Sequence, residues 1–305
     1  MLKFITDAQV VHALSYATVS ASIEQAFESL ARGRAAIKAR QRIDCGAVKL
    51  SSMGAIWLDV GLAAEKVYPT VDGQFGFLLN LFDTHTGKPL AVMPANEITR
   101  FRTPALTVMA AKKGSTGHRK LALFGAGFQG RAHFEALVKA LPFEQVDVVD
   151  LADVSAWCAE MSQLYGLVVR QCAAEQAVND ADVVVTVTRA KAPLFDGHWL
   201  KPGTFVAAVG TSLPTGRELD DHTLARAARI VVEWKPQSML EAGEIVLGKA
   251  AGSVQDARVV DLPEIFSGRA VWRTDPQEVI VFKAVGVGLT DLAAAALVWQ
   301  QWGNT

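Results

Sequence analysis

The sequence has few cysteines, no long apolar run and no excess of charge of one sign. Its 305 residues include three cysteines, Cys45, Cys158 and Cys172, and no two of them have the short spacing of zinc ligands or redox dithiols. This excludes a disulfide framework and indicates free thiols in a reducing compartment, so we predict a cytoplasmic protein. The formal net charge is −1, from 30 basic and 31 acidic residues. No basic surplus is therefore available to attract nucleic acid or a membrane surface, although the net charge does not exclude a local basic patch.

Signals for a membrane span, a secretory leader and a metal are also missing. The longest apolar stretch, Ala284 to Trp299, contains Asp291 and falls short of the roughly 20 residues that a membrane-spanning helix needs, so it predicts a buried helix. The N-terminal segment is interrupted by Asp7 and His12 and lacks the apolar run of a signal peptide. The six histidines are scattered without metal-ligand spacing, so we predict no catalytic metal.

Two patterns follow each other along the chain and predict two domains. From about Lys38 to Met93, short apolar runs are separated by Gly, Asp and Thr, which is typical of strands joined by turns. After the polar segment 112–118, apolar runs alternate with helix-compatible segments, which is typical of a doubly wound parallel sheet. The predicted parallel strands are Leu121–Phe124, Val146–Asp150, Leu167–Arg170, Val183–Thr188, Phe205–Val209 and Ile230–Glu233.

We therefore predict an α/β protein with a Rossmann domain and a second domain built from both chain ends. Residues 1–114 are expected to form the first part of an α+β domain, and residues 115–275 the Rossmann domain. Residues 276–305 are expected to return to the first domain as an apolar segment without a strand of its own.

The sharpest local motif is a run of three glycines, Gly125, Gly127 and Gly130, in a GxGxxG pattern. It follows the apolar strand KLALF and precedes a helix-compatible segment, which is the context that a dinucleotide-binding turn requires. Gly125 allows the tight turn, Gly127 lets the backbone approach the pyrophosphate, and Gly130 lets the helix pack against the strand. The helix N-terminus then offers N–H groups to the phosphates.

The next predicted strand ends in an acid, Asp150, which lies 20 residues after Gly130. A carboxylate at this place accepts hydrogen bonds from the adenine-ribose hydroxyls and repels a 2′-phosphate, which favours NAD(H) over NADP(H). The alternative is that Asp150 only caps a loop.

The chain resembles the ornithine cyclodeaminase/μ-crystallin family over nearly its whole length. The blocks that carry this resemblance are AAEKV ending at Val67, FDTHTGKPLAVM, ITRFRTPA around Arg102, GAGFQGRAHFEAL, VTVTRAKAPLF, AVGTSLPTGRELDD and VFKAVGVGLTDLAAAALV. The resemblance implies a nicotinamide cofactor, a small imino or amino acid substrate, and a homodimer formed through the sheet of the first domain. It also implies that Gln129, Thr188 and Gly210 line the cofactor cleft.

Three basic positions match the substrate site of this family. They are Lys66, Arg102 and an N-terminal arginine, for which Arg42 matches best and Arg40 is a rival. A guanidinium binds a carboxylate with two parallel hydrogen bonds, which suits an α-imino acid. The alternatives are that these arginines belong to a solvated face and that Lys66 is an ordinary surface lysine. Glu241 to Glu244 also follows a family pattern, and by default we expect it to be a solvated helix end.

One departure from the family bears on the reaction. The cyclodeaminases carry an aspartate where this chain has Ser212, and a serine hydroxyl is a poor base at neutral pH. The resemblance therefore implies reduction of a cyclic ketimine carboxylate, with Lys66 and Ser212 as catalytic groups. The leading pairs are Δ1-pyrroline-2-carboxylate to proline and Δ1-piperideine-2-carboxylate to pipecolate. The alternatives are an ornithine cyclodeaminase, an amino-acid dehydrogenase, and a non-catalytic binding protein.

Overall fold

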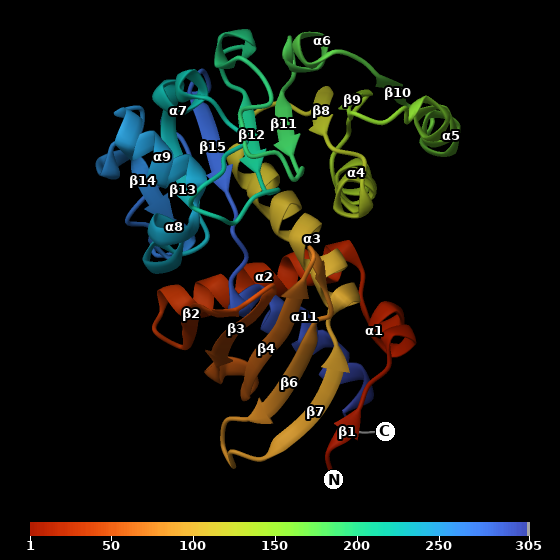
Figure 1. The fold of residues 1–305 in the computed structure, drawn as a ribbon, viewed down its shortest axis with the longest axis vertical. Helices are drawn as coiled ribbons and strands as arrows, with labels where there is room; N and C mark the ends of the chain where they lie inside the picture. Colours follow the sequence, from red (N-terminus) through yellow and green to blue (C-terminus); the bar gives the residue numbers. More distant parts are fainter. Residues whose placement is uncertain (304–305) are drawn as a thin grey trace. The chain divides into compact units, whose positions relative to one another are not determined.

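The computed structural model describes residues 1–303 and divides the chain into two compact units (Figure 1). The terminal unit comprises Met1–Leu106 and Gly286–Thr305, and the central unit comprises Thr107–Val285. The predicted fold class, a Rossmann sheet with a second domain built from both chain ends, is confirmed. No helix within residues 1–303 is both long and apolar enough to span a membrane.

The unit boundaries differ from the predicted ones at 114 and 275. The first boundary falls inside helix α3 (Asn96–Gly114), and the second follows Val285. The reason for the second difference is strand β15 (Val279–Lys283), which lies between β12 and β13 in the central sheet. The segment predicted to contain no strand therefore begins with one, and only the part from Gly286 belongs to the terminal unit.

The terminal unit contains a seven-stranded sheet in the order β1-β7-β6-β4-β3-β2, with β5 paired to β4. Only the short β1–β7 pair is parallel. The strands are β1 (Lys3–Phe4), β2 (Ala35–Cys45), β3 (Val48–Trp57), β4 (Leu62–Val71), β5 (Gln74–Phe75), β6 (Leu78–Asp83) and β7 (Pro89–Pro94); the helices are α1 (Asp7–Ala13), α2 (Tyr16–Ala31), η1 (Leu58–Val60) and α11 (Gly288–Trp302).

One face of this sheet is buried under helices, and a lysine lies in its centre. Met53, Lys66, Leu79 and Met93 stand directly opposite one another on β3, β4, β6 and β7, so their side chains share a face. All four are buried. Helices α2 and α11 pack over this face, as Figure 1 shows. A lysine in an apolar row indicates a function, because an ammonium group is costly to bury without a partner.

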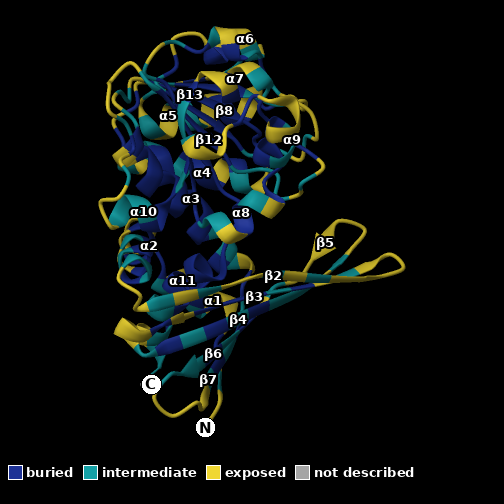
Figure 2. Ribbon diagram, turned by 90° about the vertical axis from the view of Figure 1, so that its left-hand side faces the viewer, coloured by how far each residue is buried: buried dark blue, intermediate teal, exposed yellow. Residues whose placement is uncertain are grey.

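The central unit contains an eight-stranded, fully parallel sheet in the order β10-β9-β8-β11-β12-β15-β13-β14. Strands β8, β11, β12 and β15 are buried along their whole length, as helices on both faces require. Figure 2 shows the interior of this unit in the dark blue of buried residues. The strands not yet given are β8 (Lys120–Phe124), β9 (Gln145–Val149), β10 (Val168–Gln171), β11 (Val183–Thr186), β12 (Phe205–Ala208), β13 (Ala227–Val232) and β14 (Val259–Asp261).

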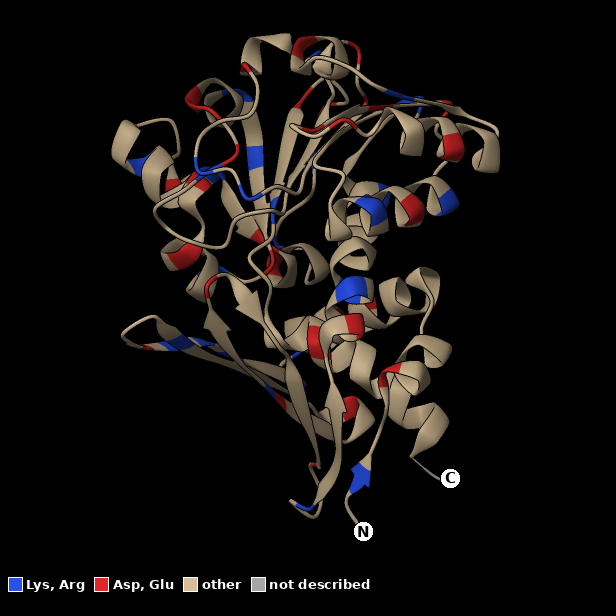
Figure 3. Ribbon diagram, turned by 45° about the vertical axis from the view of Figure 1, so that its right-hand side comes forward, with Lys and Arg blue, Asp and Glu red and all other residues tan. Residues whose placement is uncertain are grey.

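The helices of the central unit follow the strands in alternation, as the sequence predicts. They are α4 (Phe128–Ala140), α5 (Ser155–Tyr165), α6 (Ala174–Val178), η2 (Gly197–Trp199), α7 (Asp221–Arg226), α8 (Lys235–Glu241), α9 (Gly243–Ala251), η3 (Asp256–Arg258) and α10 (Leu262–Phe266). Basic and acidic residues are interspersed along the elements of both units (Figure 3), in keeping with the near-neutral formal charge.

Candidate functional site

The glycine motif forms the turn between β8 and α4. Gly125 has a φ of +98°, and a Cβ there would lie 2.8 Å from the carbonyl oxygen of Val187. A Cβ on Gly130 would lie 1.9 Å from the carbonyl oxygen of Gly125, so the helix begins directly against the strand end. Gly127 is the N-cap of α4 and no side chain caps this helix end. A Cβ on Gly127 would meet no atom within 4 Å, so the space in front of the helix N-terminus is open, as phosphate binding requires.

Asp150 follows β9 and holds this turn in place. Its Oδ2 accepts a hydrogen bond from the amide of Ala126 at 2.7 Å, and its Oδ1 accepts one from the amide of Ala152 at 2.9 Å. Asp150 therefore caps the loop, as the alternative expected. Each carboxylate oxygen keeps a second lone pair, so binding of a ribose hydroxyl stays a prediction that this geometry allows. The residues present fit a dinucleotide at this turn.

Two further loops at the carboxyl edge of the sheet are tied together by one buried glutamate. Glu218 accepts hydrogen bonds from the amide and hydroxyl of Thr188 and from the amide of Gly210, at 2.7–2.8 Å. It also accepts one from the hydroxyl of Thr186 at 3.0 Å. Thr188 and Gly210 follow β11 and β12, so a single carboxylate fixes both loops that were predicted to line the cofactor cleft.

A buried ion pair continues this network toward Ser212. Glu244 Oε2 lies 2.9 Å from Lys283 Nζ, and neither side chain is exposed. Lys283 donates a hydrogen bond to the carbonyl of Thr211 at 2.7 Å, and the amide of Glu218 donates one to Glu244 at 2.9 Å. The default expectation of a solvated helix end is therefore wrong for Glu244. Ser212 itself is half-buried in the loop that this network holds.

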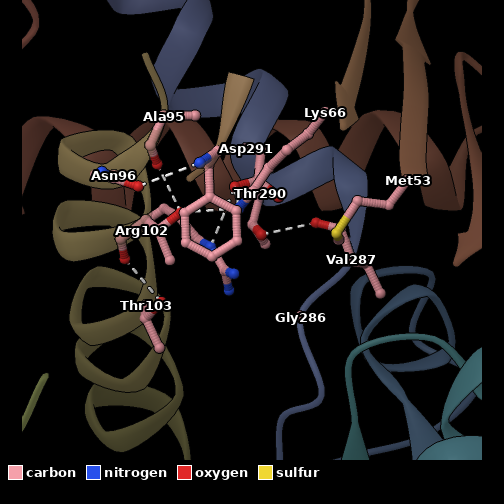
Figure 4. A network of polar contacts seen from close by, with 12 residues as sticks. Met53, Lys66, Ala95, Asn96, Arg102, Thr103, Gly286, Val287, Thr290 and Asp291 are labelled. Atoms are coloured by element: carbon pink, nitrogen blue, oxygen red, sulfur yellow. Dashed lines mark hydrogen bonds and ion pairs between the residues drawn. The ribbon is translucent and has the colours of Figure 1, made fainter. Parts of the chain in front are cut away.

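In the terminal unit, Lys66 and Arg102 converge on one aspartate (Figure 4). Lys66 Nζ lies 2.8 Å from Asp291 Oδ1, and Arg102 Nε lies 3.3 Å from the same oxygen. Lys66 also donates a hydrogen bond to the hydroxyl of Thr99, one turn before Arg102 on α3. The alternative of an ordinary surface lysine is wrong, because the Lys66 side chain is 2 % exposed.

Arg40 joins this cluster through an irregularity in β2. Lys38 pairs with Gly54 but Gln41 pairs with Ser52, so Ala39 and Arg40 together stand opposite Met53. This bulge turns Arg40, and Arg42 after it, to the covered face of the sheet. Arg40 Nη2 donates to the carbonyl of Gly286 at 2.8 Å.

The guanidinium groups of Arg40 and Arg102 end at the same place. A Cβ on Gly286 would lie 3.1 Å from Arg102 Nη2 and 3.2 Å from Arg40 Nη2. Arg40 also acts electrostatically on both Lys66 and Asp291. Arg42 lies two residues further along β2, opposite Ser51, and is half-buried. The contacts therefore connect Arg40, the second of the two candidate N-terminal arginines, with Arg102 and Lys66.

The cluster carries more positive than negative charge. Three cations (Arg40, Lys66 and Arg102) surround one carboxylate, which leaves a formal excess of two positive charges. Burial lowers the pKa of Lys66 to about 8, Asp291 opposes this effect, and Arg102 adds to it. Burial alone would raise the pKa of Asp291, but Lys66 and Arg102 outweigh it and hold that pKa below its usual value. The cluster is therefore suited to bind an anion.

An aromatic wall stands beside the cations. Lys66 Nζ lies 4.2 Å from the centre of the Phe77 ring and 6.0 Å from that of Tyr68. The two rings pack edge to face, with 4.8 Å between their centres. A ligand at this place would meet cationic groups for a carboxylate and apolar ring faces for a hydrocarbon part.

Sequence reasoning did not identify Asp291, Glu218 or the Glu244–Lys283 pair as parts of these sites. Asp291 was visible as the one acid in the apolar run 284–299, and that interruption was its only signal. Within residues 1–303, no group of three or more His, Cys, Asp or Glu side chains is arranged to hold a metal ion.

Comparison with known proteins places the chain in a family. The profile of the ornithine cyclodeaminase/mu-crystallin family matches residues 4–305. The mouse ketimine reductase mu-crystallin is 34 % identical over 226 residues, which cover 73 % of this chain and 69 % of the mouse protein.

Two solved structures extend the likeness over the whole chain. A probable ornithine cyclodeaminase from Bordetella pertussis is 39 % identical with a TM-score of 0.95, covering 99 % of both chains. The Δ1-pyrroline-2-carboxylate reductase of Thermococcus litoralis, solved with NADH and L-proline, is 27 % identical with a TM-score of 0.91, covering 99 % of this chain and 97 % of that one. The chain described here belongs to the ornithine cyclodeaminase/mu-crystallin family.

Proposed function

We propose that this protein is an imine reductase that converts a small cyclic ketimine carboxylate to the cyclic amino acid with NADH. The leading reactions are Δ1-pyrroline-2-carboxylate to proline and Δ1-piperideine-2-carboxylate to pipecolate. The observation that carries the proposal is the cluster of half-buried Arg40 with buried Lys66 and Arg102 around Asp291, with its excess of positive charge. The relatives support it, since they include a ketimine reductase and a reductase solved with NADH and L-proline.

The residues of the terminal unit bind and orient the substrate in this proposal. The guanidinium groups of Arg40 and Arg102, which end at the same place, hold the substrate carboxylate with charge-assisted hydrogen bonds. Phe77 and Tyr68 contact the ring methylenes. Arg40 takes the role for which the sequence favoured Arg42, because the bulge in β2 gives Arg40 the contact with Gly286 beside Arg102.

Lys66 supplies the proton that the reaction consumes. An imine, a proton and a hydride give the amine, and a protonated iminium accepts a hydride more readily than a neutral imine. With a pKa of about 8, Lys66 is mostly protonated at neutral pH and can release its proton more easily than an exposed lysine. A bound nicotinamide supplies the hydride. Ser212, in the loop held by Lys283, is proposed to hydrogen-bond the ring nitrogen.

The turn of the central unit is proposed to bind NAD(H) in preference to NADP(H). Gly125, Gly127 and Gly130 shape the helix N-terminus for the pyrophosphate. Asp150 has acceptor capacity left for the ribose hydroxyls, and its charge opposes a 2′-phosphate. Gln129, Thr188 and Gly210 are proposed to line the same cleft.

We further propose a homodimer that forms through the sheet of the terminal unit. The ends of the β2–β3 hairpin and of β4 and β5 are exposed in Figure 2, and these ends and the start of β6 carry large apolar side chains, which are typical of a partner surface. These residues are Ile43, Val48, Leu50, Val71, Phe75 and Leu78. Analytical ultracentrifugation of the wild-type protein tests the dimer.

We also propose that the protein works in the cytoplasm, which its free cysteines support.

A second candidate is ornithine cyclodeaminase, because the Bordetella relative at 39 % identity is named as a probable one. The experiment that separates the two incubates the protein either with Δ1-pyrroline-2-carboxylate and NADH or with ornithine and NAD+. Stoichiometric proline formation and NADH oxidation in the first incubation support reduction. Ammonia release from ornithine without net reduction of NAD+ selects the cyclodeaminase. Tight NADH binding without turnover in either incubation selects the non-catalytic binding protein.

A further inference from the structure

We infer that Asp291 is a positioning residue whose carboxylate keeps Lys66 in its cationic form and orients Lys66 and Arg102 toward the substrate. This inference rests on the proposed function and deepens it, because it names the group that prepares the proton donor. Asp291 lies in the first turn of α11, and its side chain is 1 % exposed.

The geometry makes Asp291 the shared partner of two cations. Its Oδ1 is 2.8 Å from Lys66 Nζ and 3.3 Å from Arg102 Nε, so one oxygen holds a strand residue and a helix residue together. The other oxygen, Oδ2, is buried and has no hydrogen-bond partner among the described residues. An under-used buried carboxylate oxygen costs stability, so an acid kept only for folding would be expected to use both oxygens.

The surroundings of Lys66 show why a carboxylate is needed there. The charged and polar groups that face Lys66 are Asp291 on α11, Arg102 and the hydroxyl of Thr99 on α3, and Arg40 on β2. Two aromatic rings also face it, those of Phe77 and of Tyr68 on β4 itself. Of these, only Asp291 is negative at neutral pH. Burial and the two arginines all favour the neutral amine, and Asp291 favours the ammonium. Without Asp291, Lys66 would lose its proton at lower pH, so a smaller fraction of the enzyme would hold the proton that the imine needs at neutral and alkaline pH.

The test measures the pH dependence of imine reduction in three variants. In Asp291→Asn, we expect the alkaline limb of the kcat/KM profile to move to lower pH by about one unit or more, because the nearby opposite charge is lost. Asp291→Glu keeps the charge, so its limb should stay near that of the wild type even if the rate falls. Glu65→Gln is the matched control: it removes the neighbouring carboxylate, which pairs with the surface residue Lys38, and should leave the limb in place.

A second measurement does not require turnover. NMR titration of isotopically labelled lysine, with the Lys66 signal assigned from its loss in Lys66→Met, should show the Lys66 pKa falling in Asp291→Asn by the same amount as the kinetic limb. An unchanged limb together with an unchanged Lys66 titration in Asp291→Asn would overturn the inference.

Two outcomes are decided by a second variant or measurement: failure of Asp291→Asn to fold, and a wild type that is inactive on cyclic imines. If Asp291→Asn does not fold, Asp291→Glu decides: a limb shifted to low pH despite the retained charge would contradict the role assigned to Asp291. If the wild type reduces no cyclic imine, the proposed function fails, while the NMR titration still decides whether Asp291 controls the protonation of Lys66.

Discussion

A Cβ atom on Gly130 would lie 1.9 Å from the carbonyl oxygen of Gly125, so these two glycines together set how closely α4 approaches the end of β8. The contact is with backbone, which cannot move aside as the end of a side chain can. Gly127, between them in sequence, has open space where a Cβ would be. The three glycines therefore differ in what they do, and substitutions can separate folding from cofactor binding.

Alanine at Gly130 and at Gly127 should have different effects. Gly130→Ala is expected to lower the free energy of unfolding by about 1–3 kcal/mol or more, because the helix must shift away from the strand. Gly127→Ala should leave the melting temperature nearly unchanged and weaken NADH binding at least about tenfold, because the methyl group occupies space that the pyrophosphate needs. Thermal unfolding and NADH fluorescence titration measure the two effects. Wild-type NADH affinity in Gly127→Ala would contradict the proposed cofactor position.

The glycine turn between β8 and α4 was predicted better than the rest of the fold, because the sequence signals for it are local. The GxGxxG spacing, the strand before it and the acid after β9 each lie within one βαβ segment, and the structure has them as expected. Strand β15 has a local signal in the run Val279-Ile280-Val281-Phe282, which was overlooked when the whole segment was assigned to the first domain. Its place between β12 and β13 depends on pairing with strands that are distant in sequence, which no local pattern shows.

The cationic cluster shows a second limit of sequence reasoning. The position of Arg40 depends on one extra residue in β2 relative to β3, and alternation along a single strand does not reveal a bulge. Asp291, Glu218 and Glu244 stand in helical or loop segments where an acid is usually solvated. Their roles depend on cations and amides that the fold brings from distant parts of the chain.

The two candidate arginines can be separated by single substitutions. Arg40→Ala should lower kcat/KM for Δ1-pyrroline-2-carboxylate by on the order of 10- to 100-fold, the loss expected for one charge-assisted hydrogen bond to a carboxylate. Arg42→Ala is the matched comparison on the same strand and should have a clearly smaller effect. Steady-state kinetics with saturating NADH measures both, and a larger loss in Arg42→Ala would return the role to Arg42.

Removing the charge of Glu218 should disturb the two loops that it fixes. Glu218→Gln replaces one acceptor oxygen by an NH2 group that faces N–H and O–H donors, so we expect a loss of about 1–3 kcal/mol in unfolding free energy. We also expect a raised KM for NADH, because Thr188 and Gly210 are no longer held together. Glu175→Gln, at an exposed acid on α6, serves as the control. A variant of Glu218 with wild-type stability and KM would show that the loops hold without it.

Asp150 should decide the choice between the two nicotinamide cofactors. The wild type is expected to have a higher kcat/KM with NADH than with NADPH. Asp150→Asn removes the charge and loses one of the two amide hydrogen bonds, to Ala126 or to Ala152, which should weaken both cofactors alike. The NADPH-to-NADH ratio of kcat/KM isolates the charge and should rise about tenfold or more. Asp153→Asn, three residues further along in an exposed position, should leave the ratio unchanged. If the wild type already prefers NADPH, the role assigned to Asp150 is wrong.

The most direct test of the cationic cluster compares two imines that differ only in the carboxylate. NADH oxidation is measured with Δ1-pyrroline-2-carboxylate and with Δ1-pyrroline, which has the same ring and no carboxylate. We predict proline formation equal to the NADH consumed with the first compound and a kcat/KM lower by a factor on the order of 1,000 or more with the second, since two charge-assisted contacts are lost. Equal rates with the two imines would contradict the account.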